Sequence, residues 1–309
     1  MKKITGLIAL VLILTSLAFL QTVKNDIVNN VEFKKNTNGT ETFHFKYTEE
    51  PLNKVVKQLG QQGPIEQKKA VLMKQGLDQL HKLSPKPSDI HVTRFIDPSV
   101  FKLTYNKKPE YFCHIWSGNE DTEVTTIKDF FDYSQNDYRH IHIYTCFANQ
   151  KLGGGWKTHG FVQEEIIAYE IPGYAALLAH TEEQKIPLMT RNPNRENSPE
   201  GTFGGSPNPL IIQGLSRVQI VDANSTPYSK AYGAGIYKIS QKMLLETTAK
   251  LNIPQDVTLL AIAAPQLKSQ DPSIQYSQEA LEDSFNTLVA GATLAQTTFV
   301  DPNRKLLIH

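Results

Sequence analysis

The sequence predicts an α/β protein in which strands and helices alternate along most of the chain. Short runs rich in β-branched and aromatic residues recur beyond residue 88, and segments with apolar residues at helical spacing lie between them. This alternation indicates a largely parallel sheet covered on both faces. The composition agrees, since 40% of the 309 residues are hydrophobic and 20% are charged, as in an ordinary globular protein.

The charge balance excludes one class of function. Lys and Arg together number 32 and Asp and Glu 31, which gives a formal net charge of +1. The whole protein therefore has no electrostatic preference for nucleic acid or for a membrane surface. We expect no sequence-specific nucleic-acid binding, and the oligomeric state is left open.

The N-terminus has the pattern of an export signal. Two lysines precede an apolar run over residues 4–20, and the next charged residue is Lys24. A short basic segment before an apolar stretch is typical of signal peptides, so residues 1–23 predict a secreted or exported protein. An uncleaved membrane anchor over residues 4–23 is the alternative, because the run approaches the length that spans a bilayer.

A mostly helical accessory region is predicted over residues 24–88. A polar, irregular stretch with a strand-like alternation over 42–47 is followed by two amphipathic helices between Leu52 and Leu83. Repeated X-Pro steps over residues 84–88 disfavour helix and mark the predicted domain boundary.

Residues 89–309 are predicted to form the α/β domain. Strands are expected over 140–147, 218–221 and 257–264, and helices over 163–170, 174–180, 238–251 and 278–294. A segment rich in Pro, Asn, Gly and Ser, residues 187–209, is expected to be a long loop.

Three consecutive glycines form the first half of a candidate site. Gly153, Gly154 and Gly155 follow the 140–147 strand and Asn149. Glycines allow positive φ and let backbone N–H groups approach a ligand closely. A glycine-rich turn alone is more often structural, so this pattern indicates a site only in combination with the residues next along the chain.

Two adjacent carboxylates form the second half. Gln163, Glu164 and Glu165 open the predicted 163–170 helix. Alone, such residues most often complement the helix dipole. After a glycine loop they can supply acid or base groups beside an anionic ligand, and a diphosphate-linked sugar fits both halves. Neighbouring helix residues point about 100° apart, so the two glutamates are expected to have different roles.

Together these features resemble the signature of the poly(ADP-ribose) glycohydrolase family. Phe-Ala-Asn at 147–149, the three glycines, a seven-residue spacer and Gln-Glu-Glu stand in the family's order. Residues 228–233 resemble the family's tyrosine segment over the substrate, and residues 259–267 resemble its following core strand. The resemblance covers residue 90 to the end and is densest over 141–170.

The resemblance implies a three-layer α/β/α macrodomain-like sandwich that hydrolyses ribose–ribose O-glycosidic bonds of poly(ADP-ribose). The implied partner is poly(ADP-ribose) or an ADP-ribosylated protein, with ADP-ribose as product and no cofactor. Glu165 matches the general acid toward the leaving ribose hydroxyl, and Glu164 the neighbour that holds the scissile ribose. The implied substrate-binding residues are Asn149, Gly153, Gly154, Gly155, Gln163 and Tyr232.

Two departures from the family pattern bear on activity. Cys146 stands where the family has an aspartate, and a thiol cannot supply the same charged acceptor at neutral pH. The family continues past its last strand into a Gly-rich diphosphate loop and a closing helix, whereas this sequence ends at His309. We therefore expect a domain truncated at its C-terminus, and a catalytically impaired ADP-ribose-binding protein is the alternative to an active hydrolase.

Metal and thiol chemistry are the remaining alternatives. His140, His142 and His159 lie near the motif, but no Cys or acidic residue stands at zinc-like spacing, so no metal site is expected. A thiol on a buried strand is more often inert than nucleophilic. Cys113 and Cys146 are too few for a disulfide framework, and whether they pair is left open.

Overall fold

The computed structural model describes residues 31–83, 89–97, 139–158, 160–186, 188–192, 202–203, 205–223, 231–264, 266–267, 278–301 and 303–309. Within these ranges the centre of the molecule is a seven-stranded sheet. In spatial order its strands are β1 (Val31–Lys35), β2 (Thr40–Phe45), β3 (Ile90–Phe95), β8 (Leu210–Val221), β9 (Thr248–Ile262), β4 (His140–Phe147) and β11 (Lys305–Ile308).

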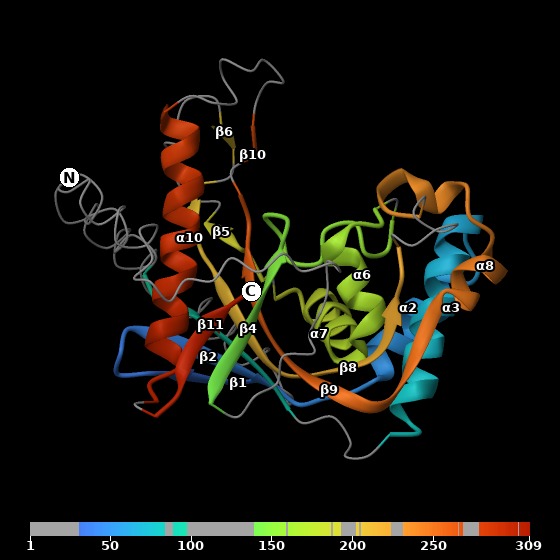
Figure 1. Ribbon diagram of the computed structural model, residues 1–309, viewed down its shortest axis with the longest axis horizontal. Coiled ribbons are helices and arrows are strands. Elements are labelled where there is room, and N and C mark those ends of the chain that lie inside the picture. Colours follow the sequence, from blue (N-terminus) through green and yellow to red (C-terminus); the bar gives the residue numbers. More distant parts are fainter. Residues whose placement is uncertain are drawn as a thin grey trace, which may run out of the picture.

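Helices pack on both faces of the sheet (Figure 1). The alternation of side chains along β9 explains this, because Leu259 and Ala261 lie in one core and Leu260 and Ile262 in the other. One face carries α2 (Glu50–Leu59), α3 (Pro64–Leu80), α6 (Gln163–Glu170) and α7 (Pro172–Glu183), and the other carries α10 (Gln278–Thr298). The predicted α/β architecture is confirmed.

The sheet is mixed, so the expectation of a largely parallel sheet was wrong. Only β9, β4 and β11 run parallel to one another. The pairs β1–β2, β2–β3, β3–β8 and β8–β9 are antiparallel. Antiparallel neighbours need no crossover helix to connect them. Between the antiparallel strands β8 and β9 the chain forms a short 3-10 helix, η2 (Gly233–Tyr237), and then α8 (Gln241–Glu246).

The predicted 238–251 helix is much shorter in the structure. The Ser240 hydroxyl oxygen accepts the N–H of Met243 at 3.1 Å and starts α8, which ends at Glu246. The chain then enters β9, where Thr248 pairs with Val221 of β8. Pairing with a neighbouring strand therefore overrides the local helical pattern.

Two polar stretches contain more structure than expected. Within the first stretch, predicted to be irregular apart from a strand-like alternation over 42–47, that alternation overlaps β2, and β1 pairs with β2 as a hairpin. The described parts of the predicted 187–209 loop form β5 (Arg191–Asn192), β6 (Thr202–Phe203) and β7 (Ser206–Pro207), and β6 pairs with β10 (Gln266–Leu267). Strands this short give too little periodicity to be read from sequence.

The sheet and the core continue across the predicted boundary at 84–88, whose residues lie outside the described ranges. β2 pairs with β3, and α3 residues share a core with α6 and α7. A division into separate domains stays a prediction, as does the targeting role of residues 1–23, which are also not described. In the part of the chain that is described, no helix is long and apolar enough to cross a membrane.

Candidate active site

The candidate site is built around two buried glutamates on the first turn of α6. Glu164 and Glu165 are 0% and 2% exposed. Carboxylates are almost never buried unless their oxygens are paired, so each must have partners in the protein. The chain supplies these partners from the segment that comes after β4.

Glu164 binds the start and the middle of that segment. Its Oε2 accepts the N–H of Asn149 at 2.9 Å, and its Oε1 accepts the N–H of Gly153 at 2.5 Å. A single side chain therefore holds the residues after β4 against the helix N-terminus. Asn149 and Gly153, both predicted site residues, are thus direct partners of the glutamate.

Glu165 binds a different pair of N–H groups. Its Oε1 accepts the N–H of Gly155 at 3.0 Å, and its Oε2 accepts the N–H of Val162 at 2.7 Å. Val162 is the N-cap of α6 and Glu165 the third helical residue, so this second bond is the glutamate half of a capping box. The neighbouring glutamates thus hold different groups.

Glycine is required where the loop passes the carboxylates. Gly153 and Gly154 have φ of +96° and +45°, and a Cβ at Gly154 would clash with Asn149 Nδ2 and lie 2.7 Å from Glu164 Oε2. A Cβ at Gly160 would lie 2.5 Å from Glu165 Oε1. The three glycine N–H groups were expected to face a ligand, but all three bind within the protein. Those of Gly153 and Gly155 donate to the two glutamates, and that of Gly154 donates to the Lys151 carbonyl at 3.3 Å.

Burial raises the pKa of the Glu164 carboxyl to about 7, and the adjacent charge of Glu165 acts in the same direction. The N–H groups of Asn149 and Gly153, which favour the ionised form, oppose this rise. Close to neutral pH the Glu164 carboxyl is therefore divided between its protonated and ionised forms.

Gln163 ties the helix to the strand. Its Nε2 donates to the carbonyl of Thr145 at 3.0 Å, and its Oε1 accepts the N–H of Phe147 at 2.9 Å. The side chain amide therefore continues the hydrogen bonding of β4 at its C-terminal end. This contact fixes where the two glutamates lie relative to the sheet.

Tyr232 lies beside the start of α6. Its hydroxyl accepts the N–H of Gln163 at 3.4 Å, and its side chain remains 38% exposed. The neighbouring Gly233, with φ of +60°, donates its N–H to the Phe161 carbonyl at 2.7 Å. The fold thus brings all the predicted site residues to one end of β4 and α6.

A buried lysine was missed by the sequence analysis. Lys69 of α3 is fully buried, and its Nζ donates to the Gly155 carbonyl at 2.9 Å. Burial lowers the pKa of its ammonium group to about 8, against the charges of Glu165 and Glu66. The available signal was its place on the apolar stripe of α3 with Leu72 and Met73, where a lysine is out of pattern.

Cys146, near the C-terminal end of β4, is a buried free cysteine. Burial raises the pKa of its thiol well above the ordinary value, and the charge of Glu164 adds to this rise. The group is a neutral thiol at physiological pH and not a charged acceptor. Cys113 lies outside the described residues.

Two of the three histidines near the motif, His140 and His142, lie among the described residues. His142 Nδ1 lies 2.8 Å from His309 Nε2, and the rings of His140 and His142 are 5.9 Å apart. Among the described residues there is no group of three or more His, Cys, Asp or Glu able to hold a metal ion. His159 is not among those residues.

Fold and site together define a mixed α/β protein with a buried pair of carboxylates under a glycine loop. No protein-family model matches the chain, and no curated protein matches its sequence. Among solved structures it is similar to the poly(ADP-ribose) glycohydrolase of Thermomonospora curvata, with a TM-score of 0.28 and 15% identity. The match covers 54% of this chain and 61% of that one, so the chain spans less than two thirds of that protein.

Proposed function

We propose that this protein is a glycosidase that hydrolyses ribose–ribose O-glycosidic bonds of poly(ADP-ribose) and releases ADP-ribose. One observation carries the proposal: the buried Glu164–Glu165 pair at the start of α6, bound to a glycine loop that comes after a parallel strand. The order of these residues along the chain is that of the family signature. The proposal does not depend on the weak likeness to a solved glycohydrolase.

The acid pair supplies a proton at neutral pH. A general acid works best when its pKa is close to the working pH, and the pKa of Glu164 is about 7. Close to neutral pH the carboxyl of Glu164, next to the proposed acid in the sequence, thus carries a proton in part of the molecules. In the proposal Glu165 delivers the proton and Glu164 holds the scissile ribose.

The reaction balances with water as the only co-reactant. The glycosidic C–O bond breaks, and the leaving ribose oxygen takes a proton from Glu165. Water adds to the anomeric carbon and returns a proton to the pair. Each carboxylate oxygen already accepts one backbone N–H but has a second lone pair, through which it can bind a sugar hydroxyl.

Tyr232 is the proposed contact for the adenine or the ribose. It is partly exposed, and its hydroxyl lies next to the N-terminus of the helix that carries the acid pair. An exposed aromatic ring offers a stacking surface for a base. The role proposed for Tyr232 rests on the same resemblance to the family signature as the roles proposed for the two glutamates.

An ADP-ribose-binding protein without hydrolase activity is the second candidate. The observation in its favour is Cys146, a buried neutral thiol in place of a charged aspartate. Such a protein would keep the glycine loop and Tyr232 for binding, but it would lack the aspartate that orients the group needed for turnover.

The test compares Glu165→Gln with the wild-type protein in two assays. Release of ADP-ribose from poly(ADP-ribose) should be lost in the variant, because an amide cannot act as an acid. ADP-ribose binding measured by calorimetry should stay within about threefold, since that change corresponds to less than one hydrogen bond. The matched control is Glu246→Gln on α8, an exposed glutamate 3.7 Å from Lys242, which should leave both readouts unchanged.

The outcomes separate the two candidates. Equal ADP-ribose release by wild type and Glu165→Gln would remove Glu165 from the acid role. Binding of ADP-ribose by the wild type without any release would reject the hydrolase and support the binding protein. Absence of both would reject the two candidates together.

A further inference from the structure

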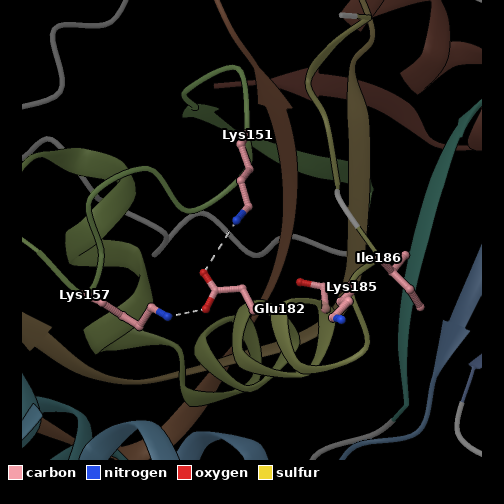
Figure 2. Close-up of a pocket in the computed structure, with 6 residues that line it drawn as sticks. Lys151, Lys157, Glu182, Lys185 and Ile186 are labelled. Atoms are coloured by element: carbon pink, nitrogen blue, oxygen red, sulfur yellow. Dashed lines mark hydrogen bonds and ion pairs between the residues drawn. The ribbon is translucent and has the colours of Figure 1, made fainter. Parts of the chain in front are cut away.

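A pocket lined mostly by charged residues lies at the ends of the glycine loop, and the two glutamates of the acid pair do not line it (Figure 2). It has a volume of about 520 Å³. Two of its lysines, Lys151 and Lys157, flank the three glycines in the sequence, and the other lining residues come from the C-terminal end of α7 and the turn after it. The lining residues are Lys151, Lys157, Thr181, Glu182, Lys185 and Ile186.

The pocket carries a surplus of positive charge. Figure 2 shows Lys151 and Lys157 reaching toward Glu182 from two sides. Lys157 forms an ion pair with Glu182, and Lys151 Nζ lies 3.9 Å from the same carboxylate. Lys185 also lines the pocket, so three lysines and one glutamate stand among the lining residues, which gives a surplus of two positive charges.

Lys185 stands at a backbone position that favours glycine. Its N–H donates to the Glu182 carbonyl at 3.2 Å, and the N–H of Ile186 donates to the Thr181 carbonyl at 2.8 Å. These two bonds form a Schellman motif that ends α7, and its C′ residue is usually glycine. Lys185 has φ of +56° there, the one positive φ of a non-glycine residue in the described part of the chain. A lysine side chain is therefore present at a conformational cost.

From this pocket we propose a binding site for a phosphate-bearing ligand that carries at least two negative charges. Ammonium groups bind phosphate as point charges, and a dianion matches the surplus of two. Lys185 supplies an ammonium group with no hydrogen bond or ion pair to the rest of the described chain, and Lys151 and Lys157 are shared between the ligand and Glu182. This site is independent of the proposed glycosidase activity.

Calorimetry of the full chain with inorganic pyrophosphate tests the site. Wild-type protein should bind one pyrophosphate, and Lys185→Gln should weaken the affinity about tenfold, the effect of one charge-assisted hydrogen bond. Glu182→Gln should strengthen the affinity severalfold, because it removes the carboxylate that competes for the lysines. Lys242→Gln is the matched control, an exposed lysine on α8 that should leave binding unchanged.

Lys185→Gly separates a binding role from a structural one. Glycine suits the positive φ, so this variant should unfold at a temperature equal to or higher than that of the wild type while losing pyrophosphate affinity as Lys185→Gln does. Absence of pyrophosphate binding by the wild type, or equal affinity in both Lys185 variants and the wild type, would overturn the proposal.

The phosphate groups could belong to a polymer or to a free diphosphate, and binding of inorganic polyphosphate distinguishes these two sources. If the site takes the phosphates of a polymer, polyphosphate should bind more tightly than pyrophosphate and lose more affinity in Lys185→Gln. If the site takes a free diphosphate, both probes should bind alike per site and lose affinity equally. No loss for either probe in Lys185→Gln would contradict the site in both forms.

Discussion

Glu164 is held in two opposing ways, by burial that favours its neutral form and by two N–H groups that favour its ionised form. Burial is the larger effect and raises the pKa to about 7 from the ordinary 4.5. Between these two values the folded protein keeps a proton that the unfolded chain releases. The contribution of this group to stability is therefore fully present below pH 4.5 and is lost as the pH rises through 7.

This difference predicts a pH-dependent stability that a single substitution removes. From about pH 4 to pH 8 the free energy of unfolding of the wild type should fall, through this group, by on the order of 3 kcal/mol. Glu164→Gln cannot titrate and should lack that part of the decrease, although it is less stable at low pH because one N–H loses its acceptor. Urea unfolding at several pH values measures how the free energy of unfolding changes with pH in the wild type and in the variant. Equal changes in the two proteins would show that the pKa of the Glu164 carboxyl is not raised.

Lys69 links an element of the predicted accessory region to the acid pair. α3 delivers the lysine to the Gly155 carbonyl, and the N–H of the same glycine binds Glu165. The Gly155 carbonyl would keep a hydrogen bond without Lys69, because the N–H of Thr158 also donates to it at 2.8 Å. The lysine therefore serves to order the loop. Helix α3 of the predicted accessory region is thus part of the structural support of the candidate site.

Lys69→Met should affect the site more than the stability. Methionine fills a similar volume and avoids the cost of burying an ammonium group, which offsets the lost hydrogen bond, so the free energy of unfolding should change by less than about 1.5 kcal/mol. With the loop less constrained, ADP-ribose affinity should fall severalfold. Lys74→Met on the exposed side of α3 is the control. Calorimetry and thermal unfolding provide the readouts, and an unchanged affinity would contradict the role given to Lys69.

Elements with strong local signals were predictable from the sequence. The boundaries of β4 and α6 agree with the expected residues 140–147 and 163–170, because the strand is rich in β-branched and aromatic residues and a glutamate at the third helical position caps the helix. The prediction of a helix over 238–251 was wrong in its second half, because Thr248 pairs with Val221, a residue of another strand that a local pattern does not reveal. Lys69 and Lys185 could not be assigned, since their roles arise from helix packing and from one backbone angle.

A buried ion pair connects the short strand β5 to the long helix α10. Arg191, the first residue of β5, pairs with Asp283 of α10, and it also donates to the Ala263 carbonyl at 3.0 Å and the Gly205 carbonyl at 2.6 Å. Both charged side chains are buried. The long segment after α7 is therefore attached to α10 through this contact.

Removal of one partner should cost far more than removal of both. Arg191→Met leaves the Asp283 carboxylate buried without its cation and should lower the free energy of unfolding by about 3–5 kcal/mol. The double variant Arg191→Met with Asp283→Leu leaves no uncompensated charge and should recover a large part of that loss. Chemical denaturation of the two variants measures the difference, and equal losses would mean that the charge on Asp283 is not the cause.

The two hydrogen bonds between Gln163 and β4 determine how the parts of the site are attached to the molecule. Its two bonds to the strand fasten the first residue of α6 to the central sheet, so the carboxylates belong to the rigid frame of the molecule. The loop over residues 151–157 is attached to that frame from outside the sheet, by side chains of α3, α6 and α7. A substrate that approaches the two carboxylates therefore meets acid groups whose position is set by the sheet and a loop whose position is set by three helices.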